Sequence, residues 1–442
     1  MFRTIPRWCI GLPRIRRPAA QLSLQAGIAA VAVLCPVSPL TAAVPLAQIN
    51  GGGAVASAPV IINELLLTND IGSTAFYFRS YYPVTSTVFQ TALINNDATQ
   101  FGLPAGSESV HFGAAEQPLS SAQLSSWANL PTGRVAAGNL LQIPLMGAGL
   151  AIPIVNRAVT GNGQLVLSDD QLCGVFSGKL FDWSQVNTNL ASGPITVVYR
   201  PESTALSYQL TQHLAAVCTT TNSNFAVPFA ASTYFVSLFT NYKPPANFKA
   251  VKGLTNTAQD LNTVETSAIG YISPDWTTID PTSNALLPSG ARSTLVVAAL
   301  SGTGSAAYLP NVADITVGLA NPGPTAINAA PPTNAAAASN ASNWLPLIPT
   351  TRRGYPIVSY STMNLPQCFA DKRVAKGLKL LLHNHYYISD YQSIQRRNGY
   401  VQITNTPAAA FLRAIVSNLL KNVNGWNVDI QNTAACATVP GR

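Results

Sequence analysis

The amino-acid sequence predicts an α/β protein with more than one domain, and three observations support this prediction. Strand-like and helix-like stretches alternate along the chain, which is the pattern of α/β folds. The chain has 442 residues, enough for about two or three domains. Hydrophobic residues make up 47% of the chain and charged residues only 10%, so a large core can be buried.

Five apolar runs are typical of buried strands, and three amphipathic stretches are typical of helices. In chain order, the strand candidates are residues 109–114, 140–147, 150–155, 194–200 and 267–273. The helix candidates are residues 168–178, 203–217 and 371–387. Residues 319–345 are rich in Ala, Asn and Pro and carry no charge, so we expect a long surface loop or an insertion there.

Residues 1–43 are typical of an export signal peptide. They contain five arginines and no acidic residue, then the apolar stretch 26–34 and a small-residue site that ends at Ala43. We place cleavage near Ala43, with Ala47 as the other candidate. The apolar stretch is far shorter than the ~20 residues of a membrane span. We therefore expect a periplasmic or secreted protein with no membrane span.

The basic character of the chain belongs largely to this signal. The formal net charge is +8, and removal of the five arginines leaves +8 − 5 = +3. The sequence has no dense Lys/Arg patch interleaved with aromatic residues, so nucleic-acid binding has little support.

Four cysteines remain beyond the signal: Cys173, Cys218, Cys368 and Cys436. In an exported chain this number suggests two disulfides, with three possible pairings. Free buried thiols are the alternative. Metal binding has less support, because no two of these cysteines have the short spacing of a zinc site.

The stretch VYRPESTALS, residues 198–207, has the pattern of an anion site. A strand-like run ends at Arg200, and the hydroxyl residues Ser203 and Thr204 precede a helical pattern. The first turn of a helix offers free backbone N–H groups and a partial positive charge. The alternative interpretation of Arg200 is a surface salt bridge, for example with Glu202.

Several segments, in order, resemble the phosphate-binding proteins of bacterial ABC importers, and above all the secreted DING subfamily. They include QINGGGAVASAPV from Gln48, VHFGAAEQPLS (110–120), LLQIPLMGAGLAIPIVN (140–156), GPITVVYRPEST (193–204) and SAIGYIS (267–273). QLCGVFSGKLFDW, residues 171–183, is the most specific of them. The resemblance covers nearly the whole chain after the signal.

The resemblance implies a type II periplasmic-binding-protein fold, in which two α/β domains are joined by crossing hinge strands and ligand lies in the cleft between them. Domain I would comprise residues 48–148 plus 274–442, and domain II residues 149–273. The implied disulfides are Cys173–Cys218 and Cys368–Cys436. Each would stabilise the fold by roughly 3–4 kcal/mol on loop-closure grounds.

The resemblance also implies a phosphate site. Arg200 matches the family arginine, Glu116 aligns with the family aspartate, and Ser86 aligns with a family serine. A guanidinium neutralises the dianion, while the carboxylate accepts the proton of hydrogen phosphate and repels sulfate, which has none. The complete implied ligand-binding set is Val55, Ala56, Ser86, Glu116, Arg200, Thr204, Ala205 and Leu206.

Besides Glu116, where the family has an aspartate, three of these positions depart from the family pattern. Val55 and Leu206 replace hydroxyl residues, and Ala205 replaces a glycine. A hydrogen bond to a charged group contributes roughly 1.5–3 kcal/mol. Loss of two such bonds would cost about 3–6 kcal/mol, or two to four decades of affinity. Thr204 and the backbone N–H groups of residues 204–206 keep part of the predicted site.

The first functional hypothesis is an exported, monomeric phosphate-binding protein that scavenges phosphate or passes it to an ABC permease. The alternatives are a binder of altered specificity, acting at the cell surface or on phosphoesters, and a low-molecular-weight alkaline phosphatase. The chain has only four histidines, few for a two-metal phosphatase. His383 and His385 would point apart on a helix, so we expect them to pack or face solvent. We assign no catalytic residue, metal or cofactor.

Overall fold

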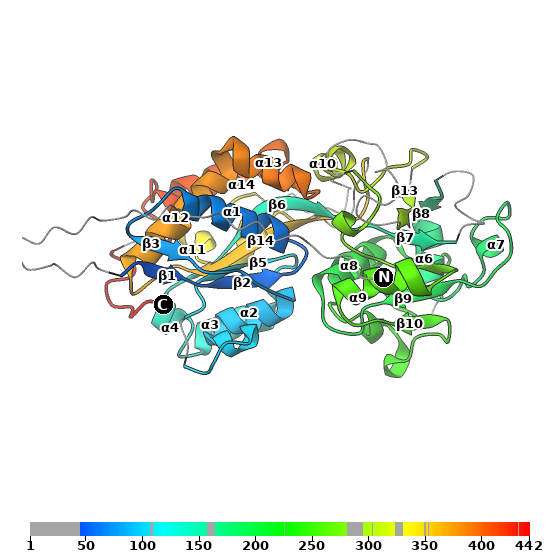
Figure 1. Cartoon of the computed structure of the whole chain (residues 1–442), viewed down its shortest axis with the longest axis horizontal. Coiled ribbons are helices and arrows are strands. Elements are labelled where there is room, and N and C mark those ends of the chain that lie inside the picture. Colours follow the sequence, from blue (N-terminus) through cyan, green and yellow to red (C-terminus); the bar gives the residue numbers. More distant parts are fainter. Residues whose placement is uncertain are drawn as a thin grey trace, which may run out of the picture. The chain divides into compact units, whose positions relative to one another are not determined.

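The structure is a computed structural model, shown in Figure 1. It describes residues 45–442 except 107–108, 157–163, 225, 281–294, 303, 323–329, 349–350, 352 and 432. The expected signal peptide lies outside the described residues. Among the helices of the described part, none is both long enough and apolar enough to cross a membrane.

The larger of two main sheets has six strands. Its order is β15 (Val401–Gln402), β6 (Leu140–Gly149), β14 (Val358–Pro366), β5 (Phe112–Ala115), β2 (Gly51–Ala54) and β4 (Tyr82–Val84). Strand β6 is buried along its whole length, which explains why its sequence is a continuous apolar run rather than an alternating one. Strands β1 (Ala47–Ile49) and β3 (Phe76–Phe78) form a separate parallel pair.

Helices cover both faces of the six-stranded sheet, and together with it they make up what we call the first lobe. Helices α2 (Ser86–Asn95), α3 (Ser121–Asn129) and α4 (Arg134–Ala137) lie on one face in Figure 1. The other face carries α1 (Ala58–Asp70), α12 (Lys372–Tyr387), α13 (Ser389–Arg397) and α14 (Ala409–Ala414). Helix α10 (Val312–Ala320) packs on β6 and β14.

The second sheet has five strands, and it is the centre of what we call the second lobe. Its order is β10 (Phe248–Ala250), β9 (Thr196–Tyr199), β11 (Ala268–Ile269), β7 (Pro153–Val155) and β12 (Val296–Val297). The helices here are α6 (Asp169–Phe176), α7 (Trp183–Val186), α8 (Ala205–Val217) and α9 (Leu254–Gln259). Strands β8 (Val166–Ser168) and β13 (Ala299–Gly302) form a parallel pair. The mixed α/β class is thus confirmed.

The domain limits inferred from the resemblance stay a prediction, and the sheets bear on where the chain changes lobe. Ala151 and Ile272 exchange backbone hydrogen bonds of 2.9 and 3.0 Å, so two chain segments run side by side there. Strand β12 follows residue 273 but pairs with β7 of the second lobe. This pairing indicates that the chain makes its final crossing from the second lobe to the first after Gly302 rather than at residue 273.

Two disulfides are present. Cys173 of α6 pairs with Cys218, which directly follows α8, and the two Cα atoms are 5.4 Å apart. Cys368 pairs with Cys436, with their Cα atoms 5.5 Å apart. These are the pairs that the family resemblance implies.

The prediction of a surface loop at residues 319–345 is wrong for the part of this segment that the structure describes. This segment contains α11 (Ala335–Ala338) and a 3₁₀ turn at Ala341–Trp344. The Trp344 side chain is fully buried, and its indole N–H donates to the Ala338 carbonyl at 2.8 Å. The side chains of Asn334 and Asn340 cap these two short turns. A composition with no apolar periodicity hides such single helical turns.

Candidate functional site

The predicted site residues follow the carboxyl ends of strands. Strand β2 ends just before Val55, and β5 ends just before Glu116. Strands β2, β4 and β5 are parallel neighbours, so these ends lie at one edge of the first sheet. In the second sheet, β9 ends just before Arg200. Open α/β sheets bind their ligands at this kind of edge.

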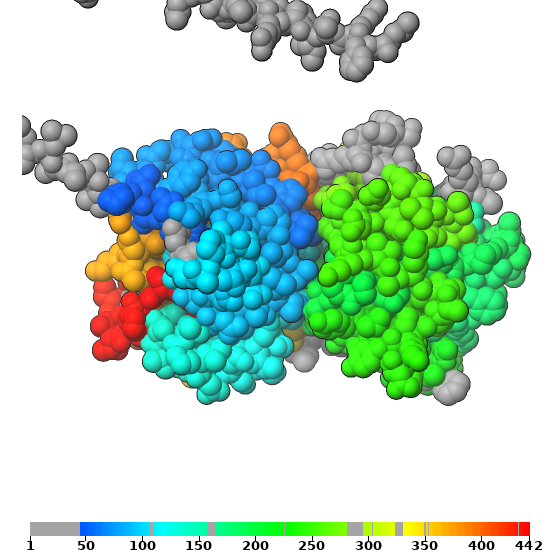
Figure 2. Space-filling view, turned by 60° about the horizontal axis from the view of Figure 1, so that its bottom comes forward, coloured from blue at the N-terminus to red at the C-terminus, as the bar shows by residue number. Residues whose placement is uncertain are grey.

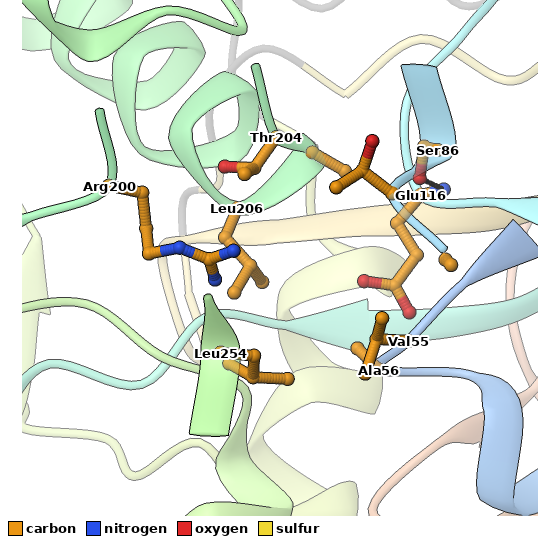
Figure 3. A pocket seen from close by; sticks show the side chains of 11 residues that line it. Val55, Ala56, Ser86, Glu116, Arg200, Thr204, Leu206 and Leu254 are labelled. Atoms are coloured by element: carbon orange, nitrogen blue, oxygen red, sulfur yellow. Dashed lines mark hydrogen bonds between the residues drawn. The ribbon is translucent and has the colours of Figure 1, made fainter. Parts of the chain in front are cut away.

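One small pocket brings the predicted residues together. It is lined by all eight of them and by Ala54, Thr85 and Leu254. Its volume is about 40 Å³, on a scale where one water needs roughly 10–15 Å³. Figure 3 shows Arg200, Thr204 and Leu206 on one side of the pocket and Ser86, Glu116 and Val55 on the other. The pocket therefore has the size for a small ion and receives side chains from both lobes.

Arg200 is the cation of the pocket. Its side chain is only 5% exposed, and its Nε donates to Glu202 Oε1 at 2.7 Å, with a second, shorter contact from Nη2. The Gly253 N–H also donates to Glu202 Oε1, at 2.8 Å. Burial alone would raise the pKa of Glu202, but the bonds from Arg200 and Gly253 lower it overall. Arg200 therefore lines the pocket and is also paired with Glu202, but the pair is buried rather than at the surface, and the role of Arg200 in ligand binding stays a prediction.

Helix N-termini add positive potential. The residues that begin α2 and α8, namely Ser86 and Ala205, line the pocket. Helix α1 begins at Ala58, two residues after the pocket residue Ala56. The first-turn N–H groups of a helix have no partner within it, and the helix dipole favours an anion there. Three helices of at least 10 residues thus start at or beside the pocket that contains Arg200, and the short helix α9 also starts there, at Leu254.

The two hydroxyls of the predicted set are held differently. The Ser86 hydroxyl oxygen accepts from the Glu116 N–H at 3.0 Å, which leaves its own proton for a ligand. The Thr204 hydroxyl caps α8 by accepting from the Ser207 N–H at 3.1 Å, and it donates to Ser207 Oγ at 2.9 Å. Ser86 is therefore the better placed hydroxyl donor, and Thr204 chiefly orders the start of α8.

Glu116 is a buried carboxyl group, with 3% of its surface exposed. Burial raises its pKa to about 7, although the Tyr400 hydroxyl, which donates to Glu116 Oε1 at 2.6 Å, lowers it. The nearby charge of Asp275 raises the pKa further. Near neutral pH this group can either accept a proton from a ligand or donate one to it.

Apart from Thr85, the rest of the wall is apolar. Val55, Leu206 and Leu254 supply alkyl groups where a saturated oxyanion site would place donors. Leu206 and Leu254 are buried, whereas Val55 is 37% exposed. The lining thus combines one cation, one carboxyl group and several backbone N–H groups with an apolar side.

Two direct hydrogen bonds join the lobes beside the pocket. The hydroxyls of Thr87 on α2 and Ser203 before α8 lie 2.8 Å apart. The Gln209 side-chain amide of α8 donates to the Glu116 carbonyl at 3.4 Å. In Figure 2 the blue and cyan surface of the first lobe meets the green surface of the second.

Some contributors carry no signal in the sequence. Tyr400 lies 284 residues after Glu116 and contacts it only through the fold. Leu254 begins α9, and neither its residue type nor its surroundings distinguish it from a core leucine. Thr85 was missed although it precedes Ser86, and its N-cap role on α2 is a signal that could have found it.

None of the four histidines lines the pocket. His385 is buried and contacts Glu64, with 2.9 Å between its Nδ1 and the carboxylate. His383 packs against the Tyr387 ring. Within the described ranges, no group of three or more His, Cys, Asp or Glu side chains is arranged to hold a metal ion.

Comparisons with known proteins show the family to which this chain belongs. Residues 45–363 match the family model described as a PBP superfamily domain. The sequence is 29% identical over 396 residues to a "Phosphate-binding protein" from an unknown prokaryotic organism, covering 86% of this chain and 98% of that one. It is 27% identical over 359 residues to "Alkaline phosphatase L" of Pseudomonas aeruginosa, covering 80% and 86%.

The solved structures that superpose on this chain include phosphate-binding proteins. An ancestral soluble variant of the human phosphate binding protein superposes with a TM-score of 0.72 at 27% identity, covering 90% of this chain and 99% of that one. A high-affinity periplasmic phosphate-binding protein, PfluDING, solved with phosphate bound, gives 0.71 at 27% identity, covering 89% and 99%. The two-domain fold expected from the sequence is thereby confirmed.

Proposed function

Because the chain belongs to the PBP superfamily, we propose that it is an exported phosphate-binding protein of the PstS/DING type. One observation carries this proposal: Arg200 and the N-termini of three helices meet at a pocket of oxyanion size between the two lobes. The names of the relatives and of the solved structures support phosphate as the anion.

The chemistry of binding follows from the lining. Arg200 supplies the positive charge, Ser86 donates its hydroxyl proton, and the first-turn N–H groups of α8 donate to further oxygens. Glu116, when ionised, accepts the proton that hydrogen phosphate carries. Phosphate replaces part of the contact between Arg200 and Glu202, so the pair both prepares the site and competes with the ligand.

The cellular location and the transport role follow from the same proposal. We place the protein in the periplasm or outside the cell, with residues 1–43 as a cleaved signal, and we propose delivery of phosphate to an ABC permease as its transport role. The relatives named as phosphate-binding proteins and the periplasmic structure support this setting.

Calorimetric titration of residues 45–442, unfolded and refolded first to strip bound ligand, tests the function. We expect phosphate to bind with Kd near the micromolar range and sulfate to bind more weakly. Arg200→Ala, which removes the pocket cation, should weaken phosphate binding by about two to four decades. Absence of binding up to millimolar phosphate, with the fold intact by circular dichroism, would overturn the proposal.

A further inference from the structure

Tyr400 contacts Glu116 from outside the pocket. It directly precedes β15, the edge strand that pairs with β6, and its side chain is buried. Its hydroxyl donates to Glu116 Oε1 at 2.6 Å, but Tyr400 is not among the residues that line the pocket. Any effect of Tyr400 on a ligand therefore passes through Glu116, which makes it a positioning residue.

The bond from Tyr400 reserves one of the two carboxyl oxygens of Glu116. Burial raises the pKa of Tyr400 well above that of an ordinary tyrosine, so the hydroxyl keeps the proton that it donates. A proton on Glu116 is then best placed on Oε2, because Oε1 remains the better acceptor for the Tyr400 hydroxyl. Figure 3 shows the Glu116 side chain directed into the pocket. Tyr400 thus leaves Oε2 to exchange a proton with a ligand.

The groups around Glu116 act in opposite directions on its ionisation. Burial and the charge of Asp275 raise the pKa of Glu116, whereas the bond from Tyr400 lowers it. Tyr81 also lies close enough to sense the charge of Glu116, but its buried hydroxyl has no hydrogen-bond partner among the described residues. Arg200 lies on the other side of the pocket (Figure 3). Tyr400 is therefore the neighbour whose hydrogen bond stabilises the carboxylate form.

The ionisation of Glu116 decides whether the pocket can distinguish phosphate from sulfate. A carboxylate accepts the proton of hydrogen phosphate and repels sulfate, which has no proton to donate. A neutral carboxyl group can donate a hydrogen bond to either anion, so it does not discriminate between them. Discrimination therefore begins at the pH where Glu116 ionises, and a group that stabilises the carboxylate lowers this pH.

We propose that Tyr400 sets the pH range in which the site distinguishes phosphate from sulfate, because it holds Oε1 of Glu116 and stabilises the carboxylate form. This inference rests on the proposed phosphate-binding function. It assigns a role in selectivity to a side chain that does not touch the ligand. Loss of the Tyr400 hydroxyl should leave the lining of the pocket unchanged and alter only the ionisation of the group within it.

Tyr400→Phe tests the inference through the pH dependence of selectivity. Residues 45–442, stripped of ligand, are titrated calorimetrically with inorganic phosphate and with sulfate between about pH 5.5 and 9, a range that spans the ionisation of Glu116. Loss of one hydrogen bond to a charged group should raise the pH at which phosphate becomes preferred by about one to two units. The preference for phosphate at about pH 8 should fall by about ten- to a hundredfold. Comparison with wild type at each pH cancels the ionisation of phosphate itself.

Tyr386→Phe is the matched control. Tyr386 is a buried tyrosine of the same lobe, and its hydroxyl donates to the Pro144 carbonyl at 2.7 Å rather than to Glu116. Both variants lose one buried hydrogen bond, but Tyr386→Phe should keep the wild-type pH profile. A Tyr400→Phe profile that also matches wild type would overturn this inference and leave the proposed function standing. Failure of wild type to bind phosphate would overturn both.

Two further measurements separate an effect through Glu116 from a general effect on packing. In the Glu116→Gln background, Tyr400→Phe should no longer shift the pH profile, and an equal shift there would refute the inference. If Tyr400→Phe does not fold, infrared difference spectra of wild type between about pH 6 and 8 decide, because this interval spans the pKa of about 7. A protonated carboxyl band should disappear in wild type and be absent from Glu116→Gln. No such band in wild type would also refute the inference.

Discussion

The two lobes contribute differently to the pocket. The second lobe supplies the charge, through Arg200 held by Glu202, and the capped N-terminus of α8. The first lobe supplies the proton-exchanging group Glu116, the hydroxyl of Ser86 and an apolar patch at Val55. Both lobes bring helix N-termini to the pocket, but only the second brings a cation, and only the first brings a carboxyl group that could discriminate among anions. Variants on each side should therefore fail in different ways.

Arg200→Ala removes the charge of the second lobe and should have the largest effect. Loss of about two charge-assisted hydrogen bonds from the guanidinium to the anion should cost roughly 3–6 kcal/mol of binding free energy. Phosphate affinity should therefore fall by about two to four decades, as measured by calorimetry. Arg413→Ala, at an exposed position on α14, is the control. Equal losses in the two variants would contradict the role of Arg200.

Glu116→Gln tests the first lobe through stability and selectivity. The pKa of Glu116 is about 7 in the folded chain and about 4.3 when unfolded. Between these values the folded state binds up to one proton more, so wild-type stability falls as pH rises, by about 4 kcal/mol in total. The free energy of unfolding of Glu116→Gln, measured by denaturant titration, should lack this dependence on pH between the two pKa values.

The same Glu116→Gln variant should also bind sulfate relatively better above pH 7, because it no longer carries a charge that repels an unprotonated anion. Calorimetry with phosphate and sulfate at pH 8 measures this change. Retention of the wild-type pH slope and of the wild-type preference for phosphate would show that Glu116 is not the discriminating group.

Val55→Thr tests the comparison by giving the first lobe an additional hydrogen-bond donor at the pocket. A new hydrogen bond to the anion should tighten phosphate binding by about 1.5–3 kcal/mol. Val317→Thr, on α10 and similarly exposed at 39%, is the control. A Val55→Thr affinity no better than that of the control would mean that residue 55 does not reach the anion.

Thr87→Val affects the contact between the lobes and should have the smallest effect. It removes the hydroxyl that lies 2.8 Å from Ser203 Oγ, at a cost of about 0.5–1.5 kcal/mol. Phosphate should dissociate faster in stopped-flow displacement. Thr91→Val is the control, because the Thr91 hydroxyl bonds only the Thr87 carbonyl within α2. Identical dissociation rates in the two variants would exclude a role for the bridge.

The sequence predicts the parts of the site that depend on local pattern. A strand followed by a short polar loop and a helix places Arg200 beside the start of α8, and the structure has β9 and α8 there. Ser86 and Glu116 required the family resemblance, because neither has a distinctive local pattern. Tyr400 and Leu254 reach the pocket through tertiary packing, which a single sequence does not display. The buried pair of Glu64 and His385 escaped prediction for the same reason.

The disulfide between Cys173 and Cys218 has a consequence for when the protein becomes competent. It fastens the far end of α8 to α6, while the near end of α8 forms part of the pocket. This bond cannot persist in a reducing compartment. We therefore expect a newly made chain to be a poor competitor for phosphate inside the cell and to acquire its full affinity only on oxidative maturation. Such timing would spare the cytoplasmic pool of phosphate from sequestration by a protein in transit.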